Sequence, residues 1–357
     1  MFEPIRPLAI LAAAQILAAA LAVATTLSDT ANAQANVQEC RGRGQLDTLY
    51  CDDNLDLVAD APTDPRKWKD PARLFFAYTP VEDPAVYQNA FKPFTDYLAQ
   101  CTGKGVVYYP VQSNTAEIEA MRSGRLHVAG FSTGPTGFAV NLAGAVPFAA
   151  KGTESGPQGY HLISLVKAGS PYQKLSDLKG KRVAHTAPSS NSGHLAPLVL
   201  YPPQGLKPNE DYRPLMSGGH DKSALGVLAG DYDMAGVASD VYDRMVERGT
   251  LKDSDFRIIF KSPVFPTSSF AYAHDLKPEL ARKLTDCFFA FRFTPAMQKE
   301  FNGNDRFVPI TYRETWKVVR EIAEGSGTPY NKAAYEAEGR REAEALARQR
   351  QQASPKQ

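Results

Sequence analysis

A short unit that occurs twice constrains the fold of this chain more than any other feature of its sequence. Met121–Gly130 aligns with Leu228–Gly236 when Gly124 is placed on Gly230. Each copy is typical of a helix end, a glycine C-cap, a charged residue, a strand and a closing Ala-Gly pair. Two copies of one helix–strand unit predict two similar lobes, although short units of this kind also recur by chance in α/β proteins.

The same alignment places two polar helix starts in equivalent positions. Asn114 falls on His220, and the loop Ser132–Gly134 falls on Ala238–Asp240. Strand ends and helix N-termini are where open α/β sheets bind ligands. We therefore expect Asn114 and His220 to face a common cleft.

Strands and helices alternate along most of the chain after residue 71. Behind the first strand, Tyr87, Phe91, Phe94 and Leu98 recur at helical spacing and are expected in the core. Strands are predicted at 74–78, 106–111, 126–131, 161–166, 183–186, 234–237, 257–260 and 270–273. This order predicts an α/β fold with mostly parallel sheets flanked by helices.

Both ends of the chain depart from this pattern. The apolar run Leu8–Val23 and the A-x-A site Ala31–Ala33 predict a signal peptide over 1–33, with an uncleaved membrane anchor as the alternative. Residues 34–70 read as a polar N-terminal extension. The charged tail 328–357 has almost no apolar face, so we expect a solvated, frayed helix there. A soluble, exported protein is expected.

Composition limits the classes of ligand. The 40 basic residues balance 39 acidic ones, so no global field attracts nucleic acid or an anionic membrane. The histidines show no metal-binding spacing and no C-x-x-C occurs, so neither a metal nor a cofactor is expected. Four cysteines in an exported chain allow three pairings, and local spacing favours Cys40 with Cys51 and Cys101 with Cys287.

Residues 187–194 place three short donor side chains between a predicted strand and a predicted helix. Ser190, Asn191 and Ser192 would offer hydroxyl and amide hydrogens to a tetrahedral anion at a helix N-terminus. The alternative is that they only cap the helix. His220 lies at another helix start after two glycines, either as a donor to the anion or as an exposed cap residue.

An enzyme is the alternative from a different class. Gly130–Gly134 matches the G-x-S-x-G nucleophile elbow and makes Ser132 the candidate nucleophile of a secreted serine hydrolase. An elbow is followed at once by a helix, and Pro135, Thr136 and Gly137 argue against one here. We therefore expect no catalysis.

The motifs together resemble the periplasmic binding proteins of phosphonate and phosphite ABC transporters. Five segments occur in the family's order, at 131–138, 177–181, 189–193, 217–221 and 262–266. The resemblance covers most of 74–326. It implies a two-lobed periplasmic-binding-protein fold of type II, with the ligand closed between lobes that crossing strands join.

The resemblance also implies roles for individual residues. In the family the serine-rich turn and the histidine hold the phosphorus oxyanion, which here implicates Ser190, Asn191, Ser192 and His220. Asn191 replaces a common threonine, and Asn114 stands where a tyrosine is frequent. Asp240 matches one carboxylate that holds the ammonium of aminoalkylphosphonates, but Ser268 stands where a second acid is expected. A smaller ligand such as phosphite, or a phosphonate with an uncharged substituent, is then expected.

We therefore predict a monomeric solute-binding protein that delivers a phosphonate or phosphite-like oxyanion to an ABC permease of the inner membrane. Lobe one would comprise 71–166 and 262–327, and lobe two 167–261, with crossings near Leu165 and Phe265. Closure would bring the serine turn and His220 against Asn114 and Thr133. A binding protein for another small anion is the alternative, and nucleic acid is not an expected partner.

Overall fold

The computed structural model describes residues 40–353, and the following description applies to the compact unit that begins at Gly42. The predicted signal peptide, 1–33, lies outside the described residues. In the described part of the chain, no helix combines the length and the apolar character that crossing a membrane requires.

The first of the two sheets has seven strands. Its strands follow the order β12-β4-β11-β3-β1-β2, and β5 pairs with β4 beside this path. The bounds are β1 Arg73–Tyr78, β2 Gly105–Tyr108, β3 Val128–Phe131, β4 Ala145–Thr153, β5 Gly156–Pro157, β11 Ser269–Ala273 and β12 Arg306–Pro309. We call this sheet and its helices the seven-stranded lobe.

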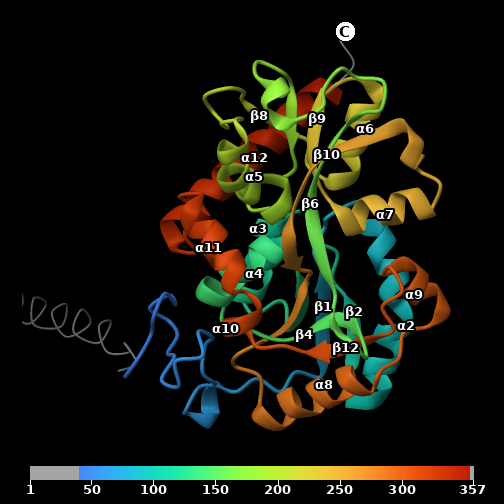
Figure 1. Ribbon diagram of the computed structural model, residues 1–357. Helices are drawn as coiled ribbons and strands as arrows, with labels where there is room; N and C mark the ends of the chain where they lie inside the picture. The colour runs from blue at the N-terminus through green and yellow to red at the C-terminus, as the bar shows by residue number, and fades with distance from the viewer. Residues whose placement is uncertain (1–39, 354–357) are drawn as a thin grey trace, which may run out of the picture. The chain divides into compact units, whose positions relative to one another are not determined.

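A five-stranded sheet has the order β10-β6-β9-β7-β8. Its bounds are β6 Gly159–Lys167, β7 Val183–His185, β8 Pro214–Met216, β9 Met234–Ala238 and β10 Phe256–Pro266. The long strands β6 and β10 pair along almost their whole length, and they lead into and out of this sheet (Figure 1). We call this sheet and its helices the five-stranded lobe.

Helices connect and cover the strands. The α-helices are α2 Pro84–Thr102, α3 Asn114–Arg122, α4 Thr133–Ala143, α5 Ala196–Leu200, α6 His220–Ala229, α7 Ser239–Glu247, α8 Pro278–Ala290, α9 Pro295–Glu300, α10 Tyr312–Thr315, α11 Lys317–Gly325 and α12 Lys332–Ala353. Shorter turns are η1 Pro65–Lys67, η2 Leu175–Leu178, η3 Asn191–Leu195, η4 Pro202–Gln204 and η5 Asp253–Asp255. The predicted aromatic stripe of α2 is confirmed as core, because its four residues are fully buried.

The predicted repeat corresponds to equivalent units of the two lobes. Strands β1, β2 and β3 have the same parallel order in one sheet as β7, β8 and β9 have in the other. Helix α3 precedes β3, and α6 precedes β9, with Gly124 and Gly230 both in the left-handed conformation after the helix. The two-lobed α/β fold is therefore confirmed, and the residue boundaries of the lobes stay a prediction.

The sheets are mixed, so the expectation of mostly parallel sheets is wrong. In the described part of the chain, four strand pairs are parallel, and the pairs β10–β6, β11–β3, β11–β4, β12–β4, β4–β5 and β6–β9 are antiparallel. The antiparallel pairs involve strands that enter or leave a lobe. A strand that re-enters a sheet without a helical crossover runs in the opposite direction to its neighbour, because parallel neighbours require such a crossover.

Proline explains why the sequence did not predict β4, β8 and β12. Pro147 lies inside β4 at an irregularity of its pairing with β11, and bulges are where a sheet tolerates proline. Strands β8 and β12 are short edge strands with prolines at their ends. These features read as turns in the sequence alone.

The C-terminal tail is not a solvated helix along its whole length, which corrects the sequence-based expectation. Tyr330 and Tyr335 are buried against Phe138, and the Tyr335 hydroxyl donates to the Thr115 carbonyl at 3.2 Å. Tyr330 just before the helix and Tyr335 in its first turn are enough to dock a helix that otherwise lacks an apolar face.

The cysteines are oxidised. A disulfide joins Cys101 of α2 to Cys287 of α8, which is the pairing that the sequence predicts. Cys40 and Cys51 are disulfide-bonded as well, and the described residues contain no free cysteine.

Candidate ligand-binding site

One cavity collects every ligand-binding residue predicted from the sequence. The cavity has a volume of about 50 Å³, several times what one ordered water needs. Its size therefore suits an anion of a few non-hydrogen atoms. The lining residues that the argument uses are Tyr78, Asn114, Ser132, Thr133, Tyr160, Thr186, Ser190, Asn191, Ser192, His220, Asp240, Arg244, Thr267 and Ser268.

The serine-rich turn follows β7 and enters the π-helical turn η3. Ser190 is the N-cap, and its Oγ accepts a hydrogen bond from the Gly193 N–H at 3.1 Å. The hydroxyl hydrogen of Ser190 is not used in this bond. The capping interpretation and the donor interpretation are therefore compatible, because they involve different atoms of one hydroxyl.

Close packing shapes the turn. A Cβ atom on Gly193 would lie 1.8 Å from Thr186 Oγ1, so only glycine fits at this position. Asn191 donates from Nδ2 to the Tyr160 hydroxyl at 3.1 Å, whereas its Oδ1 and Thr186 Oγ1 are buried without a partner in the described part of the chain. Unpartnered buried polar atoms beside a cavity indicate a polar occupant.

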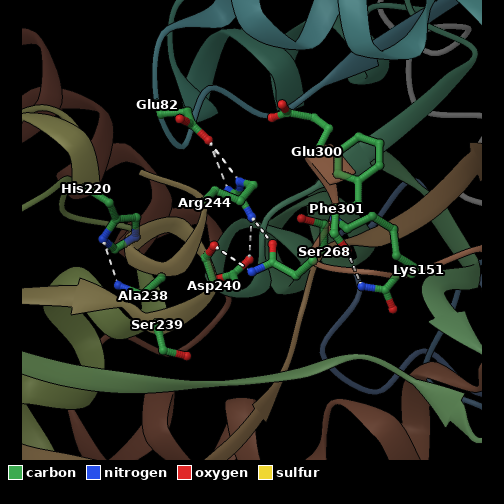
Figure 2. Close-up of polar contacts among 12 residues, drawn as sticks. Glu82, Lys151, His220, Ala238, Ser239, Asp240, Arg244, Ser268, Glu300 and Phe301 are labelled. Carbon is green, nitrogen blue, oxygen red and sulfur yellow. Dashed lines mark hydrogen bonds and ion pairs between the residues drawn. The ribbon is translucent and has the colours of Figure 1, made fainter. Parts of the chain in front are cut away.

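His220 begins α6, and its surroundings determine its tautomer. The Ala238 backbone N–H donates to Nδ1 at 3.2 Å (Figure 2). The neutral ring therefore carries its hydrogen on Nε2. Burial lowers the pKa of His220 to about 4, so the ring is neutral at pH 7 and offers one N–H donor.

The two residues predicted for the site from the seven-stranded lobe, Asn114 and Thr133, already form hydrogen bonds within the protein. Asn114 donates from Nδ2 to Ser189 Oγ at 3.0 Å, and its Oδ1 accepts from Thr79 Oγ1 at 2.9 Å. Thr133 donates its hydroxyl to the Pro266 carbonyl at 2.9 Å. Asn114 thus links the seven-stranded lobe to the serine turn of the five-stranded lobe.

Asp240 is ion-paired, which the sequence did not reveal. Its Oδ2 accepts from Arg244 Nη1 at 3.2 Å, and the same guanidinium reaches Glu82 Oε1 at 3.0 Å (Figure 2). Arg248 also pairs with Glu82 at 2.7 Å. Burial alone would raise the pKa of Glu82, but Arg244 and Arg248 outweigh this effect and hold that pKa below its ordinary value.

Similarity to known proteins identifies the family of the chain. Residues 76–315 match the family described as "ABC transporter, phosphonate, periplasmic substrate-binding protein". The chain belongs to this family. It is a substrate-binding protein and not an enzyme.

Two relatives illustrate the similarity of this phosphonate-family binding protein to characterised sequences. It is 29% identical over 263 residues to the phosphate-import protein PhnD of Mycolicibacterium smegmatis, covering 70% of this chain and 81% of that protein. It is 24% identical over 226 residues to the phosphonates-binding periplasmic protein of Escherichia coli, covering 62% of this chain and 67% of that protein.

Solved structures show the same fold at low sequence identity. A binding protein component of an ABC phosphonate transporter from Pseudomonas aeruginosa matches with a TM-score of 0.64 and 20% identity, covering 80% of this chain and 100% of that chain. PhnD1 of Prochlorococcus marinus, in complex with methylphosphonate, matches with a TM-score of 0.64 and 17% identity, covering 71% and 98% of the two chains.

Ser132 lines the cavity of the binding protein without the geometry of an elbow. Contrary to the sequence-based expectation, α4 begins directly after it, with Pro135 in its first turn. Ser132 nevertheless has an ordinary extended backbone, φ −65° and ψ 166°, and not the strained turn of a nucleophile. No histidine is hydrogen-bonded to Ser132 among the residues that the structure describes.

Sequence reasoning missed three groups near the ligand cavity of this binding protein. Tyr160 lies on a long strand whose tyrosine carries no local motif. Arg244 is four residues after Asp240 on one helix, a spacing that predicts a salt bridge and was not used. Lys151 and Tyr78 meet only through the tertiary fold.

Proposed function

We propose that the protein captures a small phosphorus oxyanion in the periplasm and delivers it to an ABC permease. The observation that carries this proposal is the convergence of Ser190, Ser192 and His220 on one cavity. Neutral donors that keep a hydrogen available bind a charged oxygen by charge-assisted hydrogen bonds. The names of the two relatives, one for phosphate and one for phosphonates, support the same ligand class.

The proposed contacts divide between the lobes. Ser190, Asn191, Ser192 and His220 would hold the oxyanion from the five-stranded lobe. Asn114 and Thr133 would close the cavity from the seven-stranded lobe, since each already hydrogen-bonds to a neighbouring group at its edge. Enclosure removes water and strengthens each hydrogen bond to the charge.

Asp240 does not offer a free carboxylate to an ammonium group. Its carboxylate is ion-paired with Arg244, whose almost completely buried guanidinium also pairs with Glu82. An ammonium at this place would compete with a guanidinium that is already there. We therefore propose a ligand with a small or uncharged substituent on phosphorus.

A thermal-shift screen tests the ligand class. The purified protein would be heated with phosphate, phosphite, methylphosphonate, 2-aminoethylphosphonate and sulfate at equal ionic strength. A ligand at a hundred times its Kd adds about 2.7 kcal/mol to the free energy of unfolding. We expect phosphorus oxyanions to stabilise the protein more than sulfate does. Equal or larger stabilisation by sulfate would favour a binding protein for another small anion.

Delivery and localisation need separate tests. Residues 1–33 are proposed to direct export, and the mature chain is proposed to act as a monomer. Mass spectrometry of the periplasmic protein would show whether its N-terminus follows Ala33, and light scattering would give its mass. ATP hydrolysis by the cognate ABC importer in liposomes should rise when the ligand-loaded protein is added.

A further inference from the structure

Lys151 is a buried cation behind the proposed ligand cavity. It lies on β4, and only 1% of its surface is exposed. Its Nζ donates to the Tyr78 hydroxyl at 2.6 Å and lies about 5 Å from the ring centres of Tyr78 and Phe301. Figure 2 shows it beside Phe301. No carboxylate forms an ion pair with Lys151 in the described part of the chain.

An ammonium removed from water needs compensation for its lost hydration. Two aromatic faces and one phenol oxygen supply part of it. The elements around Lys151 contribute no anionic partner, whereas the other buried cation, Arg244, has two. A negative charge in the adjoining cavity would complete the environment of Lys151.

The hydrogen bond from Lys151 to Tyr78 is followed by one between Tyr78 and Ser268, at the edge of the cavity. A lysine ammonium can only donate, so the Tyr78 oxygen accepts. The Tyr78 hydroxyl and Ser268 Oγ are 2.9 Å apart, and both residues line the cavity. If Tyr78 donates to Ser268, the Ser268 hydrogen is free. If Ser268 donates to Tyr78, the Tyr78 hydrogen is free. Each arrangement leaves one O–H donor for the cavity.

A second hydroxyl lies next in sequence to this pair. Thr267 Oγ1 is buried, lines the cavity and has no hydrogen-bond partner in the described part of the chain. A buried hydroxyl without a partner is rare in a folded protein. An oxygen atom in the cavity would serve both this hydroxyl and the free donor of the Tyr78–Ser268 pair.

We propose that Lys151, Tyr78 and Ser268 form a subsite for an anionic oxygen on the ligand. Lys151 acts as a positioning residue, because Tyr78 accepts from Lys151 and donates to Ser268, and the Ser268 hydroxyl contacts the ligand. This proposal rests on the proposed function and specifies its substrate. The ligand carries either a fourth oxygen on phosphorus or a carboxylate attached directly to phosphorus, and an ammonium substituent is rejected.

Titration calorimetry with ligands that differ only in the fourth substituent tests the subsite. The probes are phosphate, phosphonoformate, phosphite, methylphosphonate and 2-aminoethylphosphonate. In the wild-type protein we expect phosphate or phosphonoformate to bind at least tenfold more tightly than the other three. The affinity of phosphate relative to that of phosphonoformate shows whether the subsite prefers a fourth oxygen on phosphorus or a carboxylate.

Two variants separate the hydroxyl from the charge. Ser268→Ala removes one hydroxyl of the pair and retains Lys151, so the oxygen-bearing ligands should lose at least tenfold in affinity. Phosphite and methylphosphonate should change less than threefold. Lys151→Met removes the charge at similar length and should weaken all anions, the oxygen-bearing ones most. Lys252→Met, at an exposed position, is the matched control and should leave the affinity for every ligand unchanged.

Each other outcome decides against the subsite. Equal loss for all ligands in Ser268→Ala, or wild-type binding of methylphosphonate as tight as that of phosphate and phosphonoformate, would overturn it while the proposed function stands. Absence of wild-type binding for every phosphorus ligand would overturn both. Circular dichroism confirms that the variants are folded, and Ser268→Ala carries the test if Lys151→Met does not fold.

Discussion

Single atoms explain how uncharged residues of this protein would donate to the proposed oxyanion. The Ser190 oxygen is used by the Gly193 N–H, and His220 Nδ1 is used by the Ala238 N–H. Each residue accepts from the protein with one lone pair and keeps its hydrogen for the cavity. The hydrogen bonds within the fold thus orient the donors before a ligand arrives.

Truncating these donors should weaken binding. Ser190→Ala, Ser192→Ala or His220→Ala should each reduce oxyanion affinity by about 1.5 to 3 kcal/mol, roughly tenfold to a hundredfold, because a charge-assisted hydrogen bond is lost. Ser190→Ala should also lower the free energy of unfolding by about 1 kcal/mol, since it removes an N-cap. Calorimetry and chemical unfolding measure both effects.

Exposed Ser254 provides the control, and Ser254→Ala should leave both quantities unchanged. Unaltered affinity in the Ser190, Ser192 and His220 variants would show that the turn only caps a helix.

The buried histidines should make stability depend on pH. Burial lowers the pKa of His220 and of His194 to about 4, below the ordinary value of 6.5. The unfolded chain therefore takes up protons first as the pH falls below 6.5. The free energy of unfolding should decrease from pH 6.5 to pH 4, by up to about 3 kcal/mol for His220 alone.

Urea unfolding at several pH values between 7 and 4.5 measures this decrease. His220→Gln should make the dependence shallower, because glutamine does not titrate. An identical slope for the wild-type and variant proteins would mean that His220 is not held neutral by burial.

At the scale of elements, α12 shows how little apolar surface is needed to dock a helix. Its buried contact is confined to the first turns, where Tyr335 meets Phe138 of α4 and Thr115 of α3. Tyr330, just before the helix, fits against Gly137, where a Cβ atom would lie 2.2 Å from its ring. The helix therefore packs on α3 and α4, which begin with Asn114 and Thr133 of the cavity.

Tyr335→Ala should remove this anchor. Loss of a buried aromatic ring is expected to lower the free energy of unfolding by about 3 kcal/mol, whereas Tyr335→Phe removes only a hydroxyl and should cost about 1 kcal/mol. Denaturant unfolding gives both values. Equal, small effects of the two substitutions would show that α12 contributes no packing energy.

At the scale of the whole molecule, the two lobes meet at close range around the cavity. A Cβ atom on Gly134 of α4 would lie 2.0 Å from the Ser189 carbonyl oxygen in the serine turn. The buried pair of Glu82 and Arg244 joins the β1–α2 loop to α7. The molecule is thus in a closed arrangement, which requires a glycine at position 134.

Gly134→Ala should prevent this closed approach, because the methyl group meets a backbone atom that cannot move without shifting the turn. We expect affinity to fall at least tenfold in calorimetry while the circular dichroism spectrum stays native. Gly169→Ala is the matched control, since a Cβ atom there meets nothing within 4 Å. Native affinity of the Gly134 variant would contradict closure at this contact.

The disulfide between Cys101 and Cys287 acts within the seven-stranded lobe and does not cross the cavity. It closes a loop with a sequence separation of 186 residues. The double variant Cys101→Ser and Cys287→Ser should lose about 2 to 5 kcal/mol of stability. Its ligand affinity should be unchanged at a temperature where it is folded. A large loss of affinity would mean that the disulfide also positions the cavity.

The sequence by itself determined the features that depend on local pattern. Helix and strand periodicity, the glycine C-caps of the repeat and the short donors at helix starts predicted the α/β lobes, the serine-rich turn, Asn114 and His220, whereas the role of Asp240 was implied only by the family resemblance. These signals lie within a few residues of one another, so no knowledge of the fold was needed.

Only the tertiary structure decided how the charges are arranged. The spacing of Asp240 and Arg244 allows a salt bridge within one helix, but only the fold brings Glu82 of the seven-stranded lobe to the same guanidinium. Lys151 lies 73 residues from Tyr78, which in turn lies 190 residues from Ser268, and no local pattern connects them. Strand direction in the sheets was also misjudged, because it depends on where a returning strand finds a partner. Burial and long-range pairing arise only when distant segments pack together, and they determine which charges remain for a ligand.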